Sequence, residues 1–279
     1  MLDQILVNPA VQSGLLPLVL ALVLCLAARP LRLRWGAAVA MGVAYLASHL
    51  ITLGLPPLPP VSAQQKLLYV AVGLLALGVA LDAAHARQAP RVAVMALAPV
   101  AALVWLALPV LMRGGAMLTW LELAGTALGA VVFMARLERQ ADKGVTLPVT
   151  LVAAAVGTGV VALLGGSASI LQLALAVAAA TGGYLLANWP RQRQPVGVAV
   201  LGLAALVPVL AGQLLLFTKA SPLAVALLLP IVFADALADR APVPAALRPV
   251  LLGALCLVPF LLAVAAAWFG AETPGAYTG

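Results

Sequence analysis

The sequence has very little charge. Of its 279 residues only 8% are Asp, Glu, Lys or Arg, whereas 65% are hydrophobic and the mean hydropathy is +1.16. A soluble domain carries about 25% charged residues, and a chain with so few could not cover its own surface with polar groups. The scarcity of charge therefore excludes an ordinary soluble domain and indicates a polytopic membrane protein.

Cysteine, histidine and catalytic motifs are scarce as well. Cys25 and Cys256 both lie inside apolar runs, which argues against a disulfide framework or a cysteine metal site. His49 and His85 are expected at opposite ends of their spans, so they do not form a pair of axial haem ligands. No G-x-S-x-G, H-E-x-x-H or phosphate-loop motif occurs. The sequence therefore predicts no enzyme activity, no cofactor and no metal site.

The net charge of +7 does not indicate a nucleic-acid-binding protein. The basic residues sit in short loops between apolar runs, and no basic face with interleaved aromatics is present. Nucleic acid is therefore not an expected partner, and the lipid bilayer is.

Apolar runs of about 20 residues recur along the whole chain, and each is long enough to cross a bilayer. They predict an all-α fold, a single domain of ten transmembrane helices joined by short loops. The expected spans are approximately residues 8–28, 35–55, 67–84, 92–112, 116–135, 145–164, 170–189, 196–217, 223–237 and 250–269.

The loop charges predict the orientation of these spans. The first apolar run is followed by Arg29, Arg32 and Arg34. If every second loop is counted from this one, these loops hold twelve of the fifteen basic residues, the three arginines included. Only Lys66, Arg113 and Lys219 fall in the other set. Because short cytoplasmic loops are enriched in Lys and Arg, both termini are expected on the outer, periplasmic side of a bacterial inner membrane.

Ionisable side chains inside a span are costly, so each is a candidate for function. His49 and Glu122 both lie about six residues from the outer end of their runs, about 10 Å below the boundary. Gln213, Trp105 and Trp120 fall at a similar depth. This layer could relay protons, or bind a quinone head group or another small amphipathic ligand from the outer leaflet. Alternatively, the residues only hydrogen-bond between helices or snorkel to the interface.

Small residues and prolines punctuate the spans. Gly125 and Gly129 form a small-xxx-small pair, which is typical of close helix packing. Prolines within the runs free backbone groups, so each predicts a kink, a hinge or a cavity wall. These are Pro99, Pro109, Pro208, Pro230 and Pro259.

Two functions are compatible with these features. The proline-interrupted spans favour a small secondary transporter or permease, with its site among His49, Glu122 and Gln213. The shortage of charge within the membrane favours instead a non-catalytic anchor or scaffold subunit, which would pair with other membrane subunits or with copies of itself. An enzyme acting on lipid lacks a recognisable nucleophile or acid–base set.

Overall fold

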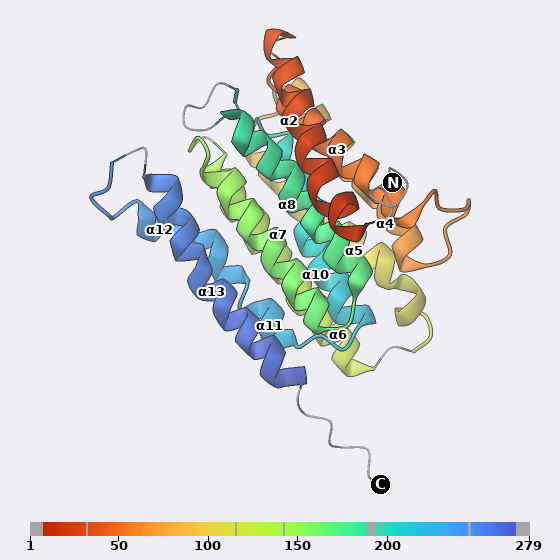
Figure 1. Cartoon of the computed structure of the whole chain (residues 1–279). Helices are drawn as coiled ribbons and strands as arrows, with labels where there is room; N and C mark the ends of the chain where they lie inside the picture. Colours follow the sequence, from red (N-terminus) through yellow and green to blue (C-terminus); the bar gives the residue numbers. More distant parts are fainter. Residues whose placement is uncertain are drawn as a thin grey trace.

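A computed structural model describes residues 8–31, 33–114, 116–141, 143–188, 194–195, 197–244 and 247–271. Of the residues that the structure describes, 81% are helical, and none of them lies in a strand. Within these ranges nine helices are long and apolar enough to cross a membrane. The helices lie side by side in one bundle (Figure 1). The prediction of an all-helical, multi-pass membrane protein is thus supported by the structure.

The elements follow one another without any intervening soluble segment. In chain order they are η1 (Val11–Leu15), α2 (Leu16–Ala28), η2 (Arg29–Leu31), α3 (Gly36–Leu53), α4 (Ala63–Ala83), α5 (Gln88–Leu111), α6 (Met117–Gln140), α7 (Thr146–Leu164), α8 (Ala168–Asn188), α9 (Val200–Ala204), α10 (Leu206–Phe217), α11 (Pro222–Ala226), η3 (Leu229–Phe233), α12 (Ala234–Ala238) and α13 (Arg248–Ala271). We call the end of the bundle that holds Arg91, Lys143 and Arg248 the inner end, and the opposite end the outer end.

Local signals set the ends of several helices. At the start of α4 the Ser62 side chain accepts from the Gln65 amide while the Gln65 side chain accepts from the Ser62 amide, a complete capping box. Helix α3 ends at Gly54, whose φ of 75° is costly for residues with a Cβ. Prolines in the following segment then prevent another helical turn before Ser62.

Two of the interior prolines coincide with breaks in helices. Pro208 has no N–H to donate to the carbonyl of Ala204, and α9 ends at Ala204. In the same way Pro230 has no N–H to donate to the carbonyl of Ala226, and α11 ends at Ala226. Pro99 and Pro109, by contrast, lie within a continuous α5. Pro259 likewise lies within a continuous α13.

The predicted ninth span is therefore an interrupted segment, residues 222–238, in which two short α-helices flank a 3-10 helix. It runs beside α13 over the whole length of that helix (Figure 1). At the outer end, a Cβ placed on Gly270 would lie 3.3 Å from the Ser221 Cβ. At the inner end, Arg248 forms an ion pair with Asp239.

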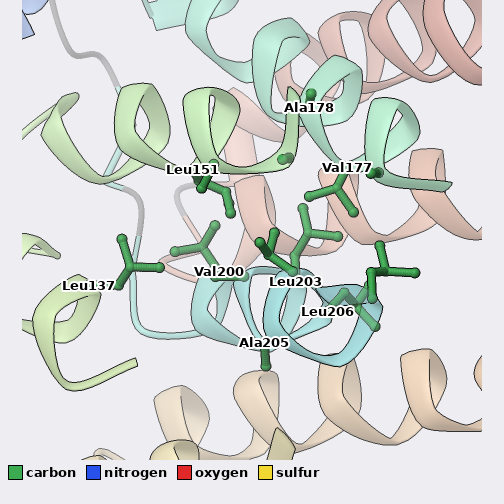
Figure 2. Packing of buried hydrophobic residues seen from close by; sticks show 14 of the residues in the cluster. Leu137, Leu151, Val177, Ala178, Val200, Leu203, Ala205 and Leu206 are labelled. Carbon is green, nitrogen blue, oxygen red and sulfur yellow. The ribbon is translucent and has the colours of Figure 1, made fainter. Parts of the chain in front are cut away.

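The core lies around α9 and α10. In the span Val200–Phe217, 78% of the apolar window is buried, against 22% for the first and last spans, Val11–Leu31 and Arg248–Gly270. Figure 2 shows Val200, Leu203, Ala205 and Leu206 packed against aliphatic side chains of neighbouring helices. This part of the bundle is a solid Leu/Ala/Val core.

Close helix contact in this core depends on Gly78 and Gly202, which were not among the glycines expected to pack helices. A Cβ on Gly202 would lie 2.4 Å from the Leu74 carbonyl oxygen, and one on Gly78 would lie 2.6 Å from the Ala199 carbonyl oxygen. Helices α4 and α9 therefore touch through their backbones. By contrast, a Cβ on Gly125 or Gly129 would meet nothing within 4 Å, so the expectation that these two glycines mediate helix packing was wrong.

Substituting Gly202→Ala should destabilise the fold by about 1–3 kcal/mol, because the new methyl group would overlap the α4 backbone. The measurement is thermal unfolding of the purified protein in detergent. Gly73→Ala is the matched control, since Gly73 also lies in an apolar helix but has open space around it. Equal melting temperatures for the two variants would contradict the backbone contact.

Candidate functional site

His49 lies in a dry, closed environment within the bundle. Its side chain is 1% exposed, and its Nδ1 lies 3.3 Å from the hydroxyl of Tyr45, one turn earlier in α3. The two rings meet edge to face, with centroids 5.8 Å apart. The neighbouring Ser48 donates to the carbonyl of Gln12 and so ties α3 to η1. His49 therefore has a partner inside its own helix, rather than the hydrogen bond between helices that the structural alternative expected.

Glu122 lies on a lateral groove of about 520 Å³, a volume in the range of small-molecule sites. Helices α6, α7 and α10 and the interrupted segment form its walls, and Gly125 and Gly129 form part of its floor. The other polar side chains on the wall, Thr126 and Thr158, donate to carbonyls of their own helices. Among the described residues lining the groove, Glu122 is thus the sole ionisable group.

Trp105 and Trp120 face outward, with 40% and 50% of their surfaces exposed. Lys66, which is only 8% exposed, lies 5.3 Å from the centre of the Trp105 ring, and its ammonium donates to the Trp105 carbonyl at 3.3 Å. That carbonyl precedes Pro109 by four residues, so it lacks the usual helical donor. Lys66 therefore satisfies a backbone group that the proline leaves free.

Gln213 lines a second cavity, of about 590 Å³, at the outer end. Its side chain is 2% exposed, and its Oε1 is buried without a hydrogen-bond partner among the residues that the structure describes. Around it lie the start of α4, the turn before α8, and Thr218 and Lys219. The lining of this cavity is more polar than that of the lateral groove.

The predicted site residues thus occupy separate environments. His49 pairs with Tyr45, Glu122 lines the lateral groove, and Gln213 lines the outer cavity. Within the described part of the chain, no hydrogen bond or ion pair joins these three side chains. A relay through direct contact among them has no support in this geometry.

A cluster of ion pairs joins distant parts of the chain at the inner end. Asp235, only 2% exposed, accepts from Arg136 at 2.6 Å and from Lys143 at 2.9 Å. Lys143 also reaches Asp239 at 2.9 Å, and Arg248 pairs with Asp239. Asp235 and Asp239 lie on one helix face, and the bridging Lys143 offsets the repulsion expected between them. The cluster fastens α12 to α6 and α13.

The charges in this cluster shift one another's titration. The hydrogen bond from Lys143 holds the pKa of Asp239 below its ordinary value, and the same bond raises the pKa of Lys143. The Asp239 contribution to stability is therefore full at neutral pH and is lost as the pH falls through its lowered pKa. The Lys143 contribution is lost only when the pH rises through its raised pKa.

Lys66 was expected in a loop but lies in the first turns of α4, and Asp235 pairs with cations far away in the sequence. The Ser62-x-x-Gln65 spacing is the pattern of a capping box, and it predicts a helix that begins before Lys66. The partners of Asp235 lie 92 and 99 residues away. No local pattern identifies such partners, because they depend on how the helices pack.

The chain matches no protein-family model and no curated protein. Its function must therefore be argued from its own geometry.

The Lys66→Met variant should lose about 1–3 kcal/mol of stability, because the Trp105 carbonyl is left without a donor. In a Pro109→Ala background the alanine N–H can bond that carbonyl, so the cost of Lys66→Met should fall by at least about 1 kcal/mol. Thermal unfolding of the four proteins in this cycle measures the coupling. Additive effects would contradict the proposed link.

Asp235→Asn should destabilise the fold by about 3 kcal/mol, because it leaves the largely buried Arg136 without a counter-charge. Asp239→Asn, at a more exposed position, should cost less than about 1 kcal/mol. Denaturant unfolding in mild detergent distinguishes the two variants. A larger loss for Asp239→Asn would show that the more exposed pairs hold the cluster together.

Proposed function

We propose that the chain is a small membrane permease whose moving part is the interrupted segment, residues 222–238. The observation that carries the proposal is that this segment crosses alongside α13 without forming a continuous helix. In many transporters, interrupted helices line the substrate path, because their backbone groups are free of regular helical bonds. Irregular backbone at membrane depth is tolerated only where protein or a cavity covers it.

Side chains of neighbouring helices supply some of the missing bonds in this segment. Gln140 donates to the Val232 carbonyl at 2.8 Å, and the Cys256 thiol lies 3.9 Å from the Ile231 carbonyl. These bonds are side-chain contacts between helices, so they can be exchanged when the segment shifts. A continuous α-helix would have no such freedom.

The interrupted segment also adjoins both cavities. Pro222, Val225 and Leu228 line the lateral groove, while Thr218 and Lys219, just before the segment, line the outer cavity. A displacement of the segment would therefore change both spaces at once. Alternating access proceeds by gating of one part of a bundle against another around a substrate site, and the interrupted segment is the part to which we assign that gating.

We further propose that the interrupted segment completes a set of ten crossings, with both termini outside a bacterial inner membrane. Its support is the segment's full-length path beside α13 and the uneven distribution of basic residues between loops. Under this topology the outer cavity faces the periplasm.

The solid core favours a second candidate function, a non-catalytic anchor or scaffold subunit. The centre of the bundle, around α9 and α10, is filled by aliphatic side chains. A scaffold needs no path through its centre, and its surface would pair with other membrane subunits.

A cysteine pair, Ser221→Cys with Gly270→Cys, tests the permease proposal. The positions suit a disulfide, because the Cβ separation of 3.3 Å is close to the usual range of about 3.5–4.5 Å. Liposomes containing the protein would be loaded with a mixture of cell metabolites. We expect selective loss of a solute class from wild-type liposomes, no loss from the oxidised pair, and recovery after reduction.

The two single-cysteine variants are the controls and should behave as wild type under both conditions. If wild-type liposomes retain every solute as well as protein-free liposomes do, the permease proposal fails. Purification of the chain in fixed ratio with another membrane protein would then support the scaffold.

A further inference from the structure

The outer cavity combines hydrogen-bond donors from three separate parts of the chain. Ala63 and Gln64 belong to the first turn of α4, Ser167 precedes α8, and Gln213 and Lys219 come from the end of α10 and the loop after it. No carboxylate occurs among the described residues that line it. The chemistry of the cavity is therefore that of a donor-rich, positively charged site.

The start of α4 supplies backbone donors. The first N–H groups of a helix have no intrahelical acceptor. The Ser62 side chain accepts from the Gln65 amide, which leaves the amides of Ala63 and Gln64 unbonded within the helix. Both residues line the cavity. With 21 residues, α4 also has a full helix dipole, whose positive end lies here.

Gln213 is the independent sign that this cavity takes a ligand. A buried amide group without a partner costs free energy, and native proteins rarely leave one unpaired. Gln213 is 2% exposed, lines the cavity, and has one amide atom unpartnered within the described ranges. The unpartnered atom is the acceptor Oε1, and the Nε2 of the same amide carries two N–H donors that can be presented to a ligand.

Lys219 adds a full positive charge at the rim, and the Ser62 and Ser167 hydroxyls can donate as well. Each of these hydroxyls accepts from an amide of its own helix, so its proton remains available to a ligand. Backbone amides at a helix start, together with a lysine, are a recurrent means of binding phosphate.

We propose that the outer cavity binds a phosphate-type oxyanion, either a free phosphate compound or the phosphate of a lipid head group. The α4 amides and Lys219 supply the positive potential, and Gln213 donates from the buried side of the cavity. This inference goes beyond the proposed function, because binding at the outer end is independent of whether the ligand is transported.

Inorganic phosphate is the probe for the free anion. Its binding to the purified full chain would be measured as a concentration-dependent rise in melting temperature. Lys219→Gln should raise the apparent Kd about fivefold, since an exposed charge pair is weakened. Gln213→Glu should raise it at least about tenfold, because like charges then face each other in the cavity.

Arg113→Gln is the matched control, since Arg113 is another cation in a loop expected on the outer side but does not line the cavity. It should bind phosphate as wild type does. Lys219 is exposed, so its variant reports on binding even if Gln213→Glu impairs folding. An equal response of wild type, Lys219→Gln and Arg113→Gln would overturn the proposal, as would the absence of any response to phosphate in both detergent and bilayer discs.

Bilayer discs distinguish the two sources of phosphate. A free ligand should give the same phosphate titration in discs of phosphatidylcholine and of phosphatidylglycerol. If the ligand is a lipid head group, the chain should instead be more stable in phosphatidylglycerol discs, and free phosphate should cause no further response there. The gain in stability should be absent from the Lys219→Gln variant. Stabilisation by ammonium ions rather than phosphate would overturn the proposal, because Gln213 would then be an acceptor for a cation.

Discussion

The need to satisfy backbone polar groups within an apolar medium governs this structure. In the hydrocarbon core no water is present to hydrogen-bond an unpaired backbone carbonyl, and each interior proline removes one backbone N–H donor from its helix. At Pro109 the Lys66 ammonium supplies the bond, and along the interrupted segment Gln140 does so for Val232. The polar side chains of Lys66 and Gln140 thus serve as donors to backbone carbonyls of neighbouring helical segments.

The packing of the bundle follows a complementary principle. Where helices must approach closely, as α4 does α9, glycine backbones meet directly and no side chain intervenes. Where glycines face open space, as Gly125 and Gly129 do, the surface becomes a groove instead. The same residue type therefore builds a close helix contact at one place and a groove at another, and only the fold distinguishes the two.

This distinction explains how far the sequence could lead. Composition and run length were enough to predict an all-helical, multi-pass membrane protein, because hydrophobicity and span length are local properties. The sequence also predicts a common depth for His49, Glu122 and Gln213, but depth along a helix says nothing of direction around the helix axis. Their separation into three environments, and the reach of Lys143 to two aspartates, depend on helix packing, which no local pattern encodes.

The ion pairs at the inner end have a consequence for the biosynthesis of the chain. Arg136 and Lys143 precede their partner Asp235 by 99 and 92 residues, so a ribosome completes the two cations long before the carboxylate. During that interval they act as bare charges and can hold the α6–α7 turn on one side of the membrane. Once α12 arrives, the same charges pair with Asp235, so the contacts that fasten α12 to the bundle form late in synthesis.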